Sequence, residues 1–258
     1  MSGQLSYVYA VVRAPAAAPD EIRGVYGAPV TLVRSGAVAA AVSAVPGEEF
    51  SETALGKRLE DLDWLETTAR AHHFVVDALA ARDTVLPLRL ATVYRDDARV
   101  AEMLSQRQEL FGALLDRLEG HVEWGVKVYA EAGAGLTAPS ATRDEPDSGR
   151  AYLRRRRQQY RSREEVWRAA ETAVRRTEEE ARALAVDRAR HRPQQGELAE
   201  GPGDNVANDA YLVPRGLGEE FRERMEHAAD DLPGVRVEVT GPWAPYSFAV
   251  LPEGSGPP

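Results

Sequence analysis

The chain has 258 residues, no cysteine and a formal net charge of −9 at pH 7. The lack of cysteine excludes disulfide bonds, cysteine nucleophiles and thiolate metal sites, and the negative charge argues against a general nucleic-acid-binding protein. Because 43% of the residues are hydrophobic and no apolar run or basic leader suits a membrane span or signal peptide, we expect a cytoplasmic globular protein of one large or two modest domains.

The N-terminal part of the chain begins with β-strand patterns. Residues 5–12 are rich in Val and Tyr and partly alternate, which predicts a strand. Residues 29–33 and 38–45 flank an Arg-Ser-Gly sequence, and this arrangement predicts a hairpin. Its second strand is almost entirely apolar, so we expect it to be buried on both faces.

Two helical patterns surround an extended one. The first covers residues 51–82 and starts at Ser51, a suitable N-cap. Residues 84–94 are apolar and extended but contain Pro87, which predicts a bulge or an irregular edge. Residues 96–118 form the second helical pattern. The inward stripe of the first helix recurs every three or four residues: Leu55, Leu59, Leu62, Leu65, Ala69, His72 or His73, Val76 and Leu79.

The second half of the chain is dominated by one long helical pattern. Residues 121–130 alternate as a strand, and residues 131–149 have the composition of a flexible loop. The helix predicted for residues 150–190 contains no Pro or Gly and would extend about 60 Å. The remaining elements are a loop (193–203), a strand (208–214), a helix (218–229), a final β pair (235–240 and 247–251) and a disordered tail (252–258).

These elements predict an α+β fold, because strands and helices alternate in mixed order. We expect two domains, residues 1–120 and residues 121–258, each with a mixed or antiparallel sheet and packed helices. At least the C-terminal domain should be ferredoxin-like, and it carries the long helix.

The segment 237–251 is the most distinctive part of the sequence. It contains Gly241-Pro242-Trp243-Ala244-Pro245-Tyr246, a rigid turn with two prolines and two large aromatic side chains. This ending closely resembles the C-terminal signature of the gas vesicle protein F/L family (GvpF/GvpL), with Ala244 in place of one of the family's prolines. Five further blocks resemble the family in the same order: 7–12, 72–94, 124–129, 149–156 and 208–213.

The resemblance implies a two-domain α+β accessory protein of gas vesicles, without catalytic activity or cofactor. It implies a role in assembly, through binding to the small hydrophobic shell protein and to other accessory gas vesicle proteins; self-association is a further expectation. Whether the chain is F-type or L-type does not follow from these motifs.

Catalytic and metal-binding motifs are weak. His73 and Asp77 share a helix face next to His72, but a third ligand and the His-Glu-x-x-His pattern are missing, so we favour a packed histidine over a metal site. Arg89, in an apolar stretch, is expected to form a structural ion pair or, alternatively, to face a groove. We assign no catalytic, metal or cofactor residue.

The candidate partner-binding residues are Arg154, Arg157, Arg161, Trp243 and Tyr246. Between residues 150 and 192 there are fourteen arginines and seven acidic residues, and the three named arginines share one stripe of the long helix. A solvated helix with ion pairs is the favoured interpretation, a docking surface for an acidic partner the second, and nucleic acid the third. The two aromatic residues either close the C-terminal domain, which we favour, or form an apolar contact patch.

The runner-up function is a small-molecule-binding or regulatory ferredoxin-like module. A closed polar pocket lined by Arg89, His73 and Tyr129 would favour that function, whereas a flat apolar patch would favour assembly.

Overall fold

The computed structural model describes residues 3–15, 22–131, 149–193 and 203–249. Two compact units divide the chain. The first comprises Met1–Val122 together with Trp243–Pro258, and the second comprises Glu123–Pro242. The second unit is therefore inserted, in sequence, into the first.

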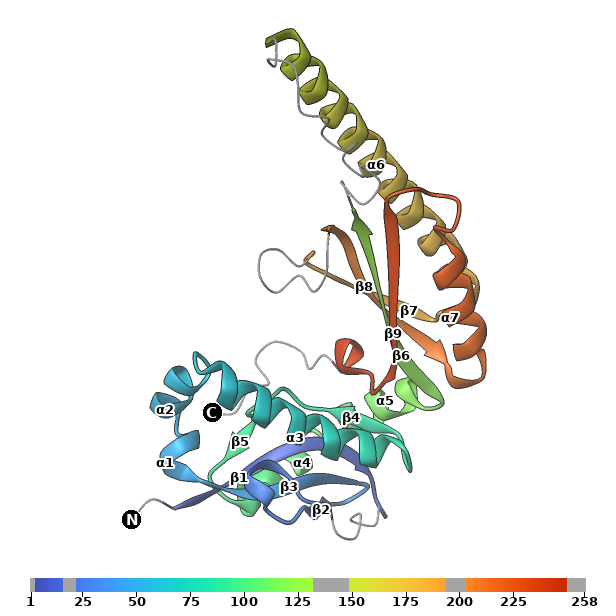
Figure 1. Cartoon of the computed structure of the whole chain (residues 1–258). Coiled ribbons are helices and arrows are strands. Elements are labelled where there is room, and N and C mark those ends of the chain that lie inside the picture. Colours follow the sequence, from blue (N-terminus) through green and yellow to red (C-terminus); the bar gives the residue numbers. More distant parts are fainter. Residues whose placement is uncertain (1–2, 16–21, 132–148, 194–202, 250–258) are drawn as a thin grey trace. The chain divides into compact units, whose positions relative to one another are not determined.

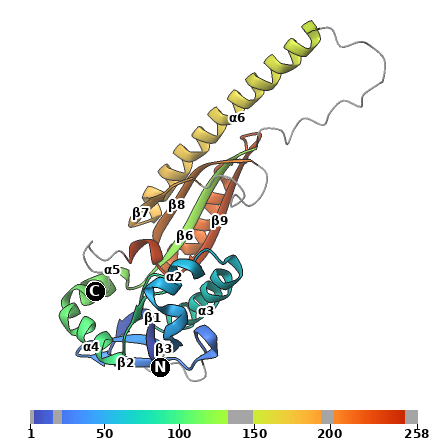
Figure 2. The ribbon, with the colours of Figure 1, turned by 90° about the vertical axis from the view of Figure 1, so that its left-hand side faces the viewer.

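The first unit is a sheet covered by helices on both faces (Figures 1 and 2). Its strand order is β2-β3-β1-β4, and the short β5 also pairs with β1. Strand β1 is almost completely buried because helix α3 packs on one face of the sheet and α4 and α5 pack on the other. The elements are β1 (Gln4–Arg13), β2 (Thr31–Ser35), β3 (Val38–Pro46), α1 (Gly47–Phe50), α2 (Glu52–Arg58), α3 (Leu62–Ala80), β4 (Val85–Pro87), β5 (Val93–Tyr94), α4 (Asp97–Gln106) and α5 (Gln108–Leu118), with a 3-10 turn, η1, at Val25–Gly27.

The helix predicted for residues 51–82 is broken into two. Ser51 caps α2 by accepting a hydrogen bond from the Ala54 N–H at 3.4 Å, and Asp61 caps α3 by accepting one from the Trp64 N–H at 3.1 Å. The break changes the phase of the apolar stripe. Leu59 and Leu62, which the unbroken pattern placed inward, are 47% and 74% exposed.

The irregular edge expected at Pro87 is present. Strand β4 ends at Pro87, and the chain passes through Ala91 in the left-handed region (φ 61°) before β5 begins. The Tyr7 hydroxyl accepts a hydrogen bond from the Ala91 N–H at 3.0 Å. A buried side chain of β1 thus holds a backbone conformation that alanine rarely adopts.

The second unit has the ferredoxin-like order βαββαβ. Its strands form a sheet of order β7-β8-β6-β9, and the fold class predicted from sequence is confirmed. The elements are β6 (His121–Ala130), α6 (Gly149–Leu184), β7 (Asp187–His191), β8 (Asp204–Pro214), a 3-10 turn η3 (Arg215–Leu217), α7 (Gly218–His227) and β9 (Val235–Trp243). The prediction missed β7, because its alternating Asp-Arg-Ala-Arg-His sequence continues the charge pattern of the helix before it.

Helix α6 is 36 residues long and packs on the sheet through small side chains. Ala170 and Ala173 are fully buried against Val128 and Ala130 of β6, with Ala229 closing the cluster. The N-terminal part of α6 extends beyond the end of the sheet (Figures 1 and 2). The predicted loop at 131–149 and tail at 252–258 lie outside the described residues, apart from Glu131 and Gly149.

The C-terminal segment corrects two sequence expectations. Residues 247–251 were predicted to form a strand, but Tyr246–Phe248 form a 3-10 turn, η4, and β9 pairs with β6. Residues 243–249 were assigned to the C-terminal domain, whereas they pack in the first unit, where Ala244 and Tyr246 join the core around Tyr7 and Tyr9. Local β propensity could not show this, since the contacts join residues far apart in sequence.

Candidate partner-binding surfaces

An apolar patch lies at the junction of α2 and α3 in the first unit, and we define it by Tyr26, Leu59, Leu62 and Trp64. Tyr26 is 52% exposed and accepts a hydrogen bond from Trp64 Nε1 at 2.9 Å, while its ring packs edge-on against buried Phe50. Leu59, just after α2, and Leu62, the first residue of α3, are also exposed. The sequence does not reveal this patch, because its helical pattern continues across the break between α2 and α3.

The two candidate aromatics of the C-terminal segment differ in their surroundings. Trp243 is 47% exposed, so a partner can reach it. Tyr246 packs against α3, with ring centroids 4.9 Å from His73 and 6.2 Å from His72. Ala244 and Phe248 are buried. The segment is thus mostly core, and Trp243 is its exposed member.

His72 lies in a buried polar network. Its Nδ1 atom is 3.0 Å from the Tyr7 hydroxyl, and the neighbouring Tyr9 hydroxyl bonds to Ser43 Oγ at 2.6 Å and accepts from the Val25 N–H at 2.8 Å. Burial lowers the pKa of His72 to about 4, and repulsion from His73 contributes. Burial also raises the pKa of Tyr7, so both groups stay neutral near pH 7. Within the described ranges, no three His, Cys, Asp or Glu side chains are grouped closely enough to hold a metal ion.

The residues proposed to line a polar pocket belong to different units. Arg89 is exposed in the first unit, and no ion pair of its side chain is found among the described residues, so the structural pair expected for it is absent there. His73 is also exposed and belongs to the first unit. Tyr129 is fully buried in the second, where the Arg236 guanidinium lies 4.0 Å from its ring centroid.

The three candidate arginines lie in the N-terminal half of α6. Arg161 is exposed, while the side chains of Arg154 and Arg157 are outside the described set. Between residues 150 and 163 the sequence has seven arginines and no acidic residue. Acidic residues begin at Glu164, which pairs with Arg168 at 2.6 Å. From Glu164 to its C-terminus, α6 forms ion pairs between its own side chains and with side chains of other elements.

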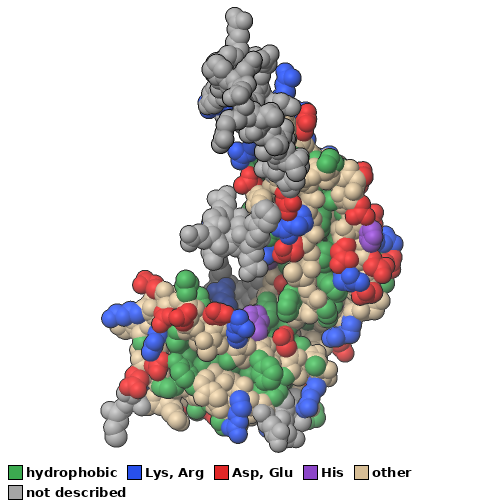
Figure 3. All heavy atoms as spheres, in the orientation of Figure 1, with side chains coloured by type: hydrophobic (Ala, Val, Ile, Leu, Met, Phe, Trp, Pro, Cys, Tyr) green, Lys and Arg blue, Asp and Glu red, His purple; other side chains and the backbone are tan. Residues whose placement is uncertain are grey.

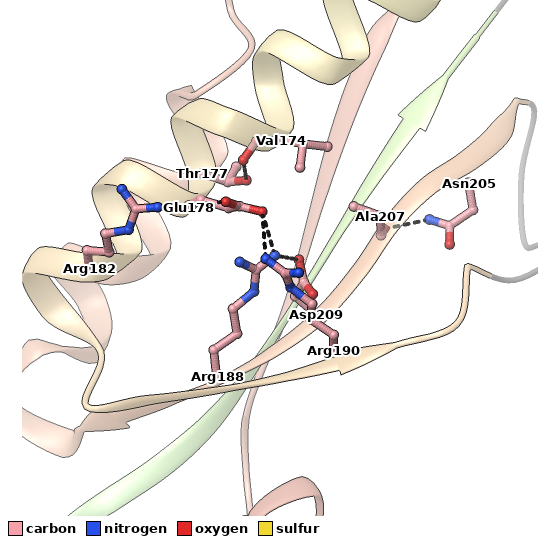
Figure 4. Close-up of polar contacts among 9 residues, drawn as sticks. All are labelled: Val174, Thr177, Glu178, Arg182, Arg188, Arg190, Asn205, Ala207 and Asp209. Atoms are coloured by element: carbon pink, nitrogen blue, oxygen red, sulfur yellow. Dashed lines mark hydrogen bonds and ion pairs between the residues drawn. The ribbon is translucent and has the colours of Figure 1, made fainter.

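An ion-pair cluster joins α6 to the sheet (Figure 4). Arg188 of β7 bonds to Glu178 of α6 at 2.7 Å and to Asp209 of β8 at 2.8 Å, and Arg190 and Arg182 lie 3.6 and 4.0 Å from Glu178. The hydrogen bond from Arg188 lowers the pKa of Glu178. Because every carboxylate of the cluster is paired, its arrangement is that of a structural anchor.

An open cleft of about 590 Å³ lies between α6 and α7. Its lining includes Arg224, which pairs with Glu180 at 3.0 Å, and Arg176, which pairs with Asp231. Acidic and basic side chains alternate over this side of the unit (Figure 3). With these charges already paired within the chain, the cleft is not the closed polar pocket that small-molecule binding favours.

The sheet face opposite the helices carries a ladder of ion pairs from β6 and β9. Arg236 bonds to Glu131 at 2.8 Å and to Glu238 at 2.9 Å, and Lys127 lies 3.7 Å from Glu238. Arg236 covers Tyr129, which joins a cation–π contact to these pairs. Among the described residues, no helix has the length and apolar character needed to cross a bilayer.

Comparison with known proteins relates this arrangement to gas vesicles. The chain is 48% identical over 254 residues to gas vesicle protein L of Streptomyces sp. (strain CB03234), covering 97% of this chain and 94% of the relative. It is 26% identical over 249 residues to gas vesicle protein F of the same strain, covering 94% and 98%.

Two crystal structures of GvpF share the fold. The protein from Anabaena sp. PCC7120 superposes with a TM-score of 0.67 at 19% identity, covering 96% of this chain and 97% of that one. The protein from Microcystis aeruginosa gives 0.65 at 20% identity, covering 96% and 99%. The family model of the gas vesicle synthesis proteins GvpL/GvpF matches residues 5–250. The chain therefore belongs to the gas vesicle GvpL/GvpF family.

Proposed function

We propose that this protein is a non-enzymatic accessory or minor structural component that acts in gas vesicle assembly, in the cytoplasm and at the gas vesicle. It works by binding the small hydrophobic shell protein and other accessory gas vesicle proteins. Membership of the GvpL/GvpF family supports the gas vesicle context. The binding role rests on the apolar patch of the first unit.

The patch supports binding because it offers exposed apolar side chains to a hydrophobic partner. Leu62 is 74% exposed and Tyr26 52% exposed, and the Tyr26 hydroxyl bonds to Glu49, which forms an ion pair with Arg58 at 3.0 Å. Exposed apolar surface with a polar rim is typical of protein-binding sites. A hydrophobic subunit that must be shielded before it polymerises is a suitable partner.

The proposal is tested by co-expressing the chain with its shell protein and measuring the amount recovered in a pull-down. We expect the double variant Leu59→Glu/Leu62→Glu to reduce binding about tenfold or more, because it places two charges in the contact. Phe74→Glu is the matched control, since Phe74 is 59% exposed on α3 but outside the patch. Circular dichroism verifies folding, and undiminished recovery with the double variant contradicts the proposal.

We assign a second contact to the acid-free part of α6 in the second unit and, separately, a third contact to Trp243 in the first unit. In the same assay with an acidic accessory protein, Arg154→Glu, Arg157→Glu and Arg161→Glu together should weaken binding, and added salt should weaken the wild-type complex. Tyr246 supports the Trp243 contact indirectly by holding the C-terminal segment on α3.

A further inference from the structure

Strand β9 is an outer strand of the second unit's sheet. The sheet order ends with β6-β9, and among the described strands only β6 pairs with β9. Val235 to Gly241 are all partly exposed along its length. A long outer strand with free backbone groups is a template for pairing with another strand.

The register with β6 shows which backbone groups of β9 face outward. The Glu131 N–H donates to the Gly234 carbonyl at 2.8 Å, and Arg236 lies over Tyr129 further along the same antiparallel pairing. Hydrogen-bonded positions alternate in such a pair, so Arg236 and Glu238 direct their backbone groups toward β6. Val237 and Val239 therefore direct their backbone N–H and C=O groups to the edge of the sheet, away from β6.

Val235 contributes only its carbonyl to this edge. Its N–H already donates to the Leu232 carbonyl at 3.3 Å, in the turn that precedes β9. Its side chain and that of Val237 pack toward the α6 cluster, whereas Arg236 and Glu238 lie on the opposite face of the sheet. The backbone groups at the outer edge thus belong to Val235, Val237 and Val239. Arg236 and Glu238 lie between these valines in the sequence.

We propose that β9 pairs antiparallel with β9 of a second copy of this chain, about a two-fold axis at Val237. The two Val237 residues then exchange both of their backbone hydrogen bonds, and each Val239 N–H donates to the Val235 carbonyl of the second copy. Arg236 of each chain stands directly opposite Glu238 of the other. The two sheets become one continuous sheet.

Charge selects this register over its neighbours. If one β9 strand shifts by two residues along the other in one direction, Arg236 of one copy lies opposite Arg236 of the other. A shift by two residues in the other direction places Glu238 opposite Glu238. Directly opposed like charges destabilise a strand pair. A shift by one residue opposes outward groups with groups already bonded to β6. Only the register centred on Val237 combines free backbone groups with opposite charges. The pairing does not depend on the proposed binding of the shell protein.

The test is the association state of the full chain, measured by analytical ultracentrifugation. We expect the wild type to dimerise, and Arg236→Glu or Glu238→Arg alone to raise the dissociation constant about tenfold or more, because each creates like-charge pairs. An equimolar mixture of the two variants should restore dimers, because glutamates on one chain then face arginines on the other. Arg168→Glu, which changes an exposed ion pair on α6, is the matched charge control and should leave the dimer intact.

A cysteine scan tests the register itself, since the natural chain has no cysteine. Under mild oxidation Val237→Cys should form a disulfide-linked dimer, because hydrogen-bonded antiparallel partners have Cα atoms about 5.5 Å apart. Val235→Cys and Val239→Cys should crosslink only when mixed with each other. The proposal is overturned if the wild type is monomeric or if the mixture of charge variants does not associate. It is also overturned if the cysteine variants crosslink in combinations other than these.

Discussion

Buried polar side chains in the first unit determine local backbone structure. The Tyr7 hydroxyl bonds to the Ala91 N–H and to His72, and the Tyr9 hydroxyl bonds to the Val25 N–H and to Ser43. Each tyrosine hydroxyl thus accepts a hydrogen bond from a backbone N–H group, Ala91 or Val25, that lies in an irregular segment outside the strand pairing of the sheet. The network accounts for His72 as a packed residue; the helical stripe predicted a packed histidine at His72 or His73, and the structure shows that it is His72.

The buried state of His72 predicts a pH-dependent stability. Because burial lowers its pKa to about 4 from an unfolded value near 6.5, the unfolded chain binds this proton first. Stability is therefore full above pH 6.5 and falls as the pH drops toward 4, by up to about 3 kcal/mol from this residue. Urea unfolding between pH 7 and pH 4 should show a smaller fall for His72→Gln than for the wild type.

His73→Gln is the control for that measurement, because His73 is the exposed neighbour on the same helix. Because repulsion from His73 contributes less than burial to the lowered pKa of His72, the fall in stability of His73→Gln should lie between that of the wild type and that of His72→Gln. If the unfolding free energy depends on pH equally in the wild type, His72→Gln and His73→Gln, the assignment of the pH effect to His72 is contradicted.

At the scale of elements, helix breaks and ion-pair anchors decide which surfaces are exposed. The caps at Ser51 and Asp61 divide one apolar pattern into α2 and α3 and so create the patch at Leu59 and Leu62. In the second unit, Arg188 connects α6 with β8 through Glu178 and Asp209. Asp209 is 6% exposed, so its charge depends on that partner.

Removing Arg188 should therefore destabilise the second unit. We expect Arg188→Leu to lower the free energy of unfolding by about 3 kcal/mol, because it leaves a buried carboxylate unpaired. The double variant Arg188→Leu/Asp209→Leu should recover part of this loss. Arg190→Ala, whose side chain is 71% exposed, should cost less than about 0.5 kcal/mol in the same urea titration. Equal costs for Arg188 and Arg190 would exclude the anchoring role.

At the scale of the whole molecule, the second unit is an insertion with adjacent ends. The chain leaves the first unit after Val122 in β6 and returns at Trp243 in β9, and these two strands are neighbours in one sheet. The returning segment then completes the first unit's core, where Ala244 is 5% exposed. The first unit consequently needs both ends of the chain.

Two chain variants test this organisation. Replacing residues 123–242 with a short glycine-containing turn should leave a first unit that unfolds cooperatively in a thermal melt. A chain that ends at Pro242 should lose about 3 kcal/mol or more of the first unit's stability, because buried side chains are removed from a packed core. Amide hydrogen exchange in β1 and α3 would report that loss, and unchanged protection would contradict it.

The sequence by itself determined the family, the α+β class with a ferredoxin-like second half, and most strands, because these depend on local periodicity and on short aromatic and proline motifs. Only the tertiary structure decided that residues 243–249 return to the first unit, that Leu59 and Leu62 are exposed, and that β9 is an outer strand among the strands described. These properties arise from contacts between residues distant in sequence, and such contacts are not encoded in the spacing of any one segment.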